Sequence, residues 1–123
     1  MASSTAAPDA YRRSAVLTAT PGQHVVMLYD GACRFLARAG AAMREGEVER
    51  AHNILRRAEL IIAHLDSSLD RDQGQLTDRL HSIYRFCLTH LNSGRVTQDA
   101  GKLDDVARLL GSLREAWAEV ALR

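Results

Sequence analysis

Histidine is the side chain in this sequence best suited to bind a metal or move a proton near neutral pH. Helical metal sites use ligands three or four residues apart, because that spacing places them on one face. Glu49 and His52 have this spacing, but no second helix carries the matching pair that a di-iron bundle needs. The five histidines are His24, His52, His64, His81 and His90. We predict that they face solvent or form hydrogen bonds, and that the chain has no metal site.

Cysteine and serine could each supply a nucleophile. Cys33 and Cys87 stand inside helical patterns without a further ligand at metal spacing, which predicts buried, reduced thiols. A disulfide would require their Cα atoms to approach within about 7 Å. Ser14, Ser67 and Ser68 lack histidine and carboxylate partners, and no glycine-rich loop could cradle a phosphate. We therefore predict a protein that is not an enzyme and holds no cofactor.

Composition and charge exclude several classes of partner. With 123 residues, of which 46% are apolar and 25% charged, the chain is expected to form one soluble domain. Sixteen basic and fifteen acidic residues leave a net charge of +1, which gives no electrostatic reason to expect nucleic acid or an anionic membrane. The N-terminus has no apolar run typical of a signal peptide, and no stretch approaches the ~20 apolar residues of a membrane span. We predict a cytoplasmic protein.

Four segments carry apolar residues in alternating steps of three and four, the spacing of a heptad seam. The predicted helices span residues 20–46, 46–70, 75–94 and 102–123. Similar lengths and short connections favour an all-α, antiparallel up-down-up-down four-helix bundle covering residues 9–123. Residues 1–8 are small and polar, and we predict that they are disordered.

Capping residues mark the ends of these helices. Thr20 can cap the first helix with Pro21 in its first turn, and Gly46 suits the position after its end. Gly94 is expected to end the third helix, and Asp99 to cap the fourth. Two glycines inside helices, at positions 31 and 111, predict close approach of another segment, because glycine is costly within a helix.

The second and third helices carry more apolar residues than the roughly three in seven that a bundle core needs. The surplus stands beside the seams, in the adjacent pairs Ile54–Leu55, Ile61–Ile62, Ile83–Tyr84 and Cys87–Leu88. We predict a groove that receives an amphipathic helix of a partner; the alternative is that these residues only broaden the core. The candidate groove residues are Tyr11, Val16, Ile54, Ile61, Leu65, Tyr84, Leu88 and Leu91.

Residues 9–19 form a short apolar segment ahead of the first helix. They include Tyr11 and Val16 and are too few to be a stable isolated helix. One hypothesis is that this segment docks on the empty groove and moves when a partner binds. The other is that Tyr11 is a permanent anchor in the core.

An ordered set of short motifs runs through nearly the whole chain. The motifs are Tyr11, 18–21 (TATP), 27–31 (MLYDG), 53–55 (NIL), Ala58, 61–62 (II), Leu65, 68–70 (SLD), Leu80, 83–84 (IY) and 113–117 (LREAW). Together they resemble the FliS-type flagellin-specific chaperones of flagellar type III export. The sequence departs from the family pattern at residues 92–94 and at Gln75, which affects the expected end of the third helix.

This resemblance implies a cytosolic four-helix bundle without enzymatic activity. Its client would be the C-terminal disordered region of flagellin, which folds on the chaperone, cannot polymerise early and is kept ready for export. The resemblance also implies contact with the cytoplasmic domain of the flagellar export gate, and family members can form homodimers. The alternative function is a homodimeric structural or regulatory bundle that uses the same apolar surface.

Overall fold

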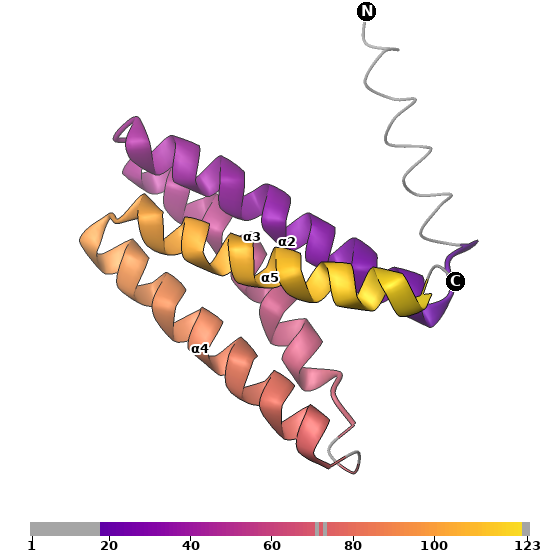
Figure 1. Ribbon diagram of the computed structural model, residues 1–123. Helices are drawn as coiled ribbons and strands as arrows, with labels where there is room; N and C mark the ends of the chain where they lie inside the picture. The colour runs from indigo at the N-terminus through magenta and orange to yellow at the C-terminus, as the bar shows by residue number, and fades with distance from the viewer. Residues whose placement is uncertain (1–17, 71, 73, 122–123) are drawn as a thin grey trace, which may run out of the picture.

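The computed structural model describes residues 18–70, 72 and 74–121. Its helices are α2 (Pro21–Arg44), α3 (Val48–Ser67), α4 (Gln75–Thr97) and α5 (Ala100–Ala121). Successive helices run antiparallel, and α5 returns beside α2 to close the bundle (Figure 1). The predicted all-α antiparallel four-helix bundle is confirmed. The predicted disorder of residues 1–8 and nearly all of the predicted docking segment, residues 9–19, lie outside the described residues.

The predicted caps of α2 are confirmed. Thr20 and Gln23 form a capping box, in which the Gln23 amide donates to the Thr20 hydroxyl at 3.2 Å and the Thr20 amide donates to the Gln23 side chain at 3.0 Å. Gly46 follows the helix with φ of 77°, and its amide donates to the Met43 carbonyl. This arrangement is a Schellman turn, which reverses the chain into α3 within three residues.

The connection between α4 and α5 differs from the prediction. Gly94 does not end α4, which continues to Thr97 and closes with Gln98 in the left-handed conformation at φ 54°. Gly94 is buried where α5 crosses: a Cβ built there would lie 3.0 Å from Leu103 Cδ1 and 3.1 Å from the Asp99 carbonyl. The residue therefore permits close helix packing. Asp99 caps α5 as predicted, its carboxylate accepting from the Gly101 amide at 3.0 Å.

The two helical glycines predicted to allow a close approach, Gly31 and Gly111, have different surroundings. Gly31 is buried on α2, and a Cβ built there would lie 3.4 Å from Ile61 Cδ1 of α3, so the predicted close approach is confirmed. Gly111 of α5 has no neighbouring atom within 4 Å of such a Cβ, so the prediction of a close contact there is wrong.

Gly94 and Gly111 form a matched pair for a stability test. Gly111→Ala is expected to raise the free energy of unfolding by about 0.5–1 kcal/mol, because alanine is the better helix former and space is open. Gly94→Ala is expected to lower it by about 1–2 kcal/mol, because overpacking against Leu103 outweighs the same propensity gain. Urea unfolding measures both changes, and two changes of equal sign would contradict the packing role of Gly94.

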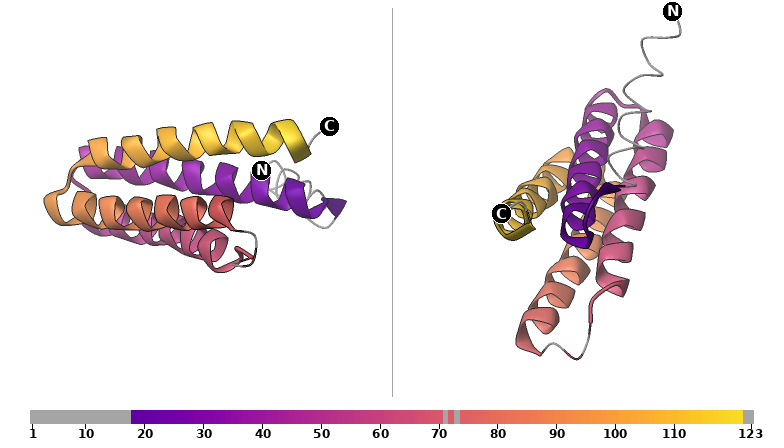
Figure 2. Two further views of the ribbon diagram at one scale, coloured as in Figure 1. Left: turned by 60° about the horizontal axis from the view of Figure 1, so that its bottom comes forward. Right: turned by 90° about the vertical axis from the view of Figure 1, so that its right-hand side faces the viewer.

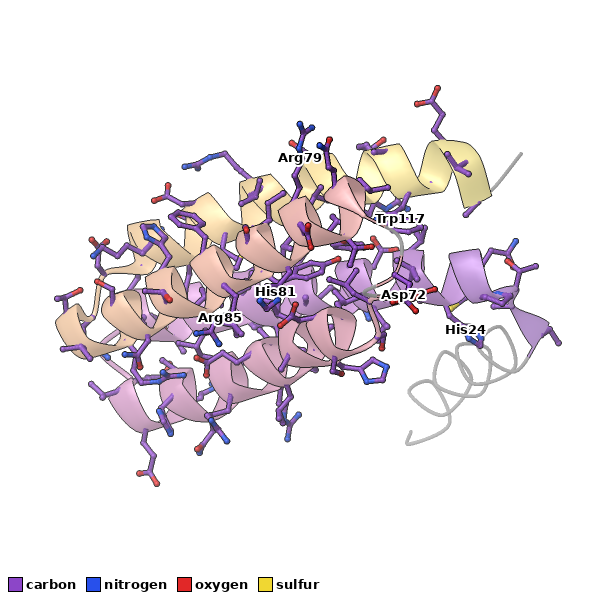
Figure 3. The ribbon with its side chains drawn as sticks, turned by 90° about the horizontal axis from the view of Figure 1, so that it is seen from below. His24, Asp72, Arg79, His81, Arg85 and Trp117 are labelled. Atoms are coloured by element: carbon purple, nitrogen blue, oxygen red, sulfur yellow. The ribbon has the colours of Figure 1, made fainter. Side chains whose placement is uncertain are left out.

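Helix α4 is the least closely packed of the four. α2 lies against α3 and α5 along its length, whereas α4 separates from α5 toward its own N-terminus (Figures 1 and 2). Polar side chains join α4 to its neighbours: Arg95 pairs with Glu59, His81 with Asp66 at 2.6 Å, and His90 with Asp105 at 3.0 Å. His81 lies between α4 and α3 (Figure 3). These contacts fix the position of α4 where apolar packing is sparse.

Both cysteines are free thiols, with Cys87 buried and Cys33 half-buried. The Cys33 thiol donates to the Ala107 carbonyl at 3.8 Å. Within the described part of the chain, no group of three or more His, Cys, Asp or Glu residues is placed to hold a metal ion. None of the helices in that part is long and apolar enough to cross a membrane.

Candidate functional site

An apolar hollow of about 300 Å³ opens at the end of the bundle where α2 begins and α3 ends. It is lined by Pro21, His24, Val25 and Leu28 of α2, by His64, Leu65, Ser68 and Leu69 of α3, and by Tyr84 and Trp117. His24 and Trp117 lie at this same end in Figure 3. Val25, Leu28, Leu69 and Trp117 are only half-buried against the core, so the hollow presents apolar surface to a partner.

Beyond this hollow, two half-buried apolar side chains lie where α2 and α3 meet. Ile61 lies against Gly31 and is half-buried, and Phe35 is half-buried one turn further along α2. At the far end a second, wider hollow of about 580 Å³ has a mostly charged lining that includes Arg38, Arg57 and the edge of Ile54. We call this face of α2 and α3, from the apolar hollow past Gly31, Ile61 and Phe35 to the charged hollow, the α2/α3 groove.

Tyr84, which lines the apolar hollow, is hydrogen-bonded to a second buried tyrosine, Tyr29. The hydroxyls of Tyr29 and Tyr84 form a hydrogen bond of 2.5 Å across the bundle, and both rings are almost fully buried. Burial raises the pKa of both hydroxyls, and the bond to Tyr29 raises that of Tyr84 further. Both tyrosines therefore stay neutral at physiological pH, and each satisfies the other's polar group in an apolar wall.

The buried Cys87 thiol should make the protein sensitive to alkaline pH. Burial raises its pKa from 9.0 to about 11, so the native state holds this proton more tightly than the unfolded state. That stabilisation is fully present below pH 9 and is lost as the pH rises to about 11, by roughly 3 kcal/mol at about 1.4 kcal/mol per pH unit. The free energy of unfolding, measured with urea between pH 8 and 11, should fall less steeply for Cys87→Ala than for the wild type. Equal slopes would contradict the raised pKa of the Cys87 thiol.

The eight candidate residues predicted from the sequence fall into three groups. Ile54, Leu65, Tyr84 and Leu91 are buried in the core cluster, Ile61 and Leu88 are half-buried, and Tyr11 and Val16 lie outside the described residues. Ile54, Leu65 and Tyr84 nevertheless line one or other hollow, and Ile61 lies between the hollows. Leu91 is wholly inside. A contact of any of these residues with a partner remains a prediction.

Four groove residues escaped the sequence reasoning: Val25, Leu28, Phe35 and Trp117. Val25, Leu28 and Trp117 have the three- and four-residue spacing of core positions in their helices, yet at the open end of the bundle they are only half-buried. The signal for Phe35 was its place beside Leu36, the same adjacent-pair pattern that drew attention to Ile61.

A second apolar surface lies where α4 and α5 separate. Leu76 and Val120 are each 67% exposed and Phe86 is 53% exposed. Spacings of three, four and seven residues place them on the same sides of their helices as the half-buried Ile83, Leu109 and Leu113. We call these six residues the α4/α5 strip.

The four-helix fold is shared with a solved structure. A solved structure described as a flagellar chaperone from bacteria superposes with a TM-score of 0.76 over 91% of this chain and 94% of that chain, at 17% sequence identity. This likeness concerns the fold.

The sequence defines the family. Residues 3–123 match the family described as flagellar protein FliS. The flagellar secretion chaperone FliS of Bacillus subtilis is 31% identical over 89% of this chain and 82% of its own length, and that of Salmonella typhimurium is 32% identical over 88% and 82%. The chain belongs to the FliS family of flagellar secretion chaperones, which confirms the resemblance of its motifs. A secretion substrate is therefore the class of partner to expect.

Proposed function

We propose that this protein is a cytosolic chaperone that binds the C-terminal disordered region of flagellin in the α2/α3 groove. Bound flagellin cannot polymerise early and is delivered to the flagellar type III export apparatus. The observation that carries this proposal is the groove itself, in which half-buried Leu28, Ile61 and Trp117 leave apolar surface uncovered on a stable bundle.

The shape of the groove suits an amphipathic segment rather than a small molecule. α2 has 24 residues, so the groove beside it is roughly 36 Å long at about 1.5 Å per residue. A disordered client that folds along it would bury apolar side chains in the apolar hollow and against Ile61 and Phe35, at an ordering cost of several kcal/mol. Moderate affinity follows, which favours release during export.

Filament growth tests the proposal. Monomeric flagellin is seeded and its polymerisation followed by light scattering, with and without one equivalent of this protein. We expect near-complete suppression of growth, and calorimetry should give one binding site for the isolated C-terminal segment. Flagellin that lacks this segment serves as the control and should not bind. Normal filament growth together with no heat of binding would refute the proposal.

The loaded chaperone is also proposed to contact the cytoplasmic domain of the export gate, in keeping with its family. The α4/α5 strip stays uncovered when a client occupies the α2/α3 groove, because none of its six residues lines either hollow of that groove. A separate surface lets one protein hold the client and a second partner together.

The second candidate function is a homodimeric structural or regulatory bundle. The exposure of Leu76, Phe86 and Val120 favours it, since two copies of the α4/α5 strip could cover each other in an isologous interface. Sedimentation equilibrium with and without the flagellin segment separates the two functions. A dimer that excludes the segment would favour the bundle function, and a one-to-one complex would favour the chaperone.

A further inference from the structure

The charged end of the α2/α3 groove holds two arginines without an acidic partner among the described residues. Arg38 of α2 and Arg57 of α3 both lie over the ring of Phe35, with their guanidinium carbons 5.8 and 5.9 Å from its centre. No carboxylate in that part of the chain forms an ion pair with either one. The two charges come from different helices, and one aromatic ring holds both beside the same hollow.

The other charges around this hollow do not neutralise the pair. Arg50 also lines the hollow, and it forms an ion pair at 3.4 Å with Glu47, three residues earlier in the chain. Glu49 is the remaining carboxylate of the lining. Three guanidinium groups against two carboxylates leave the hollow positive, although the whole chain carries a net charge of only +1.

The two ends of the groove therefore differ in chemistry. One end is apolar and lies over Tyr84 and Trp117, and the other is basic and lies over Phe35. We infer that Arg38 and Arg57 bind carboxylate side chains of the client segment, so that an acidic stretch at one end of that segment fixes its direction along the groove. This inference rests on the proposed function, and it adds the charge pattern of the segment and its polarity.

Arginine suits this role. A guanidinium stacked on an aromatic ring is held in place yet keeps its donors free, so it can form paired hydrogen bonds with a carboxylate. Charge pairing at the rim of an interface contributes mainly to specificity and to the rate of association, and it weakens with salt. Apolar contacts would then supply most of the affinity for the client, and the charge pairs would set its direction along the groove.

Charge reversal tests the inference. The full chain carrying both Arg38→Glu and Arg57→Glu is titrated with the C-terminal segment of flagellin from the same cell, at low and at high salt. We expect about a tenfold or greater loss of affinity at low salt, shrinking to about twofold or less at high salt. The matched control carries Arg56→Glu and Arg85→Glu, two exposed arginines that line neither hollow, and should lose little.

Changing the client completes the test. A flagellin segment whose acidic residues are replaced by lysine should bind the chaperone carrying Arg38→Glu and Arg57→Glu more tightly than it binds the wild-type chaperone. The inference is overturned if reversed and control variants bind equally well, or if the reversed variant binds weakly at every salt concentration, since the loss would then come from packing around Phe35. A wild-type protein that binds no flagellin segment would instead refute the proposed function, and this inference with it.

Discussion

Replacing Ile61 by aspartate is expected to weaken binding of the flagellin segment by about ten- to a hundredfold while the bundle stays folded. Ile61 is half-buried against Gly31 in the middle of the α2/α3 groove. Covering an aliphatic side chain is worth about 1.5–3 kcal/mol, and each 1.4 kcal/mol is a factor of ten in affinity. A carboxylate at this position removes that gain and must itself be desolvated when the client binds.

Leu60→Asp is the matched control for Ile61→Asp. Leu60 is adjacent on α3 and 61% exposed, lies about 100° from Ile61 around the helix, and lines neither hollow of the groove. It should leave affinity within about twofold. Calorimetry gives the affinities, and thermal melts followed by circular dichroism report whether each variant is folded. If Ile61→Asp unfolds the protein, or if both variants bind like the wild type, Ile61 is not a groove residue.

Arg95→Ala is expected to lower the free energy of unfolding by about 2–4 kcal/mol. The Arg95 guanidinium pairs with Glu59, donates to His52 at 3.1 Å and donates to Asn92 at 3.0 Å. The side chains of Arg95 and Glu59 are only 19% and 13% exposed, so removal of the arginine leaves a poorly solvated carboxylate between α3 and α4. α4 has few apolar contacts there to compensate.

Two further variants check this explanation. Adding Glu59→Gln to Arg95→Ala should recover part of the lost stability, because the uncompensated charge is then absent. Arg56→Ala, at an exposed position on α3, should change stability by no more than about 0.5 kcal/mol. Urea unfolding measures all three. If Arg95→Ala lowers the free energy of unfolding no more than Arg56→Ala does, the contacts of Arg95 do not hold α4 in place.

Local signals were sufficient to predict the fold. Heptad seams indicate four amphipathic helices, and the short turn at Gly46 requires α2 and α3 to be antiparallel neighbours. Gly94 was misread because a glycine near the end of a helix has two uses, as a left-handed terminus or as a flat face for another helix. Which of the two applies at Gly94 depends on the packing of Leu103 from α5 against it, and the sequence around Gly94 does not show that contact.

The candidate site could be predicted only in part. Adjacent apolar pairs identified α3 as a surface helix, and Ile61 does lie in the groove. The same reasoning made Tyr84 a groove candidate, and Leu91 was a further candidate, but both are almost fully buried in the core, where Tyr84 forms part of the floor of the apolar hollow. The groove borders α2 because Gly31 lets α3 approach there, and a one-dimensional pattern does not show which pair of helices leaves surface uncovered.

Trp117 provides the most direct measurement of the central claim, because it is the only tryptophan in the chain and it lines the apolar hollow of the α2/α3 groove. Its fluorescence is recorded while a flagellin C-terminal segment without tryptophan is titrated into the full chain. We expect the emission to shift to shorter wavelength and to saturate at one equivalent, with the same affinity as calorimetry gives. Saturable binding by calorimetry with an unchanged Trp117 spectrum would show that the client binds elsewhere.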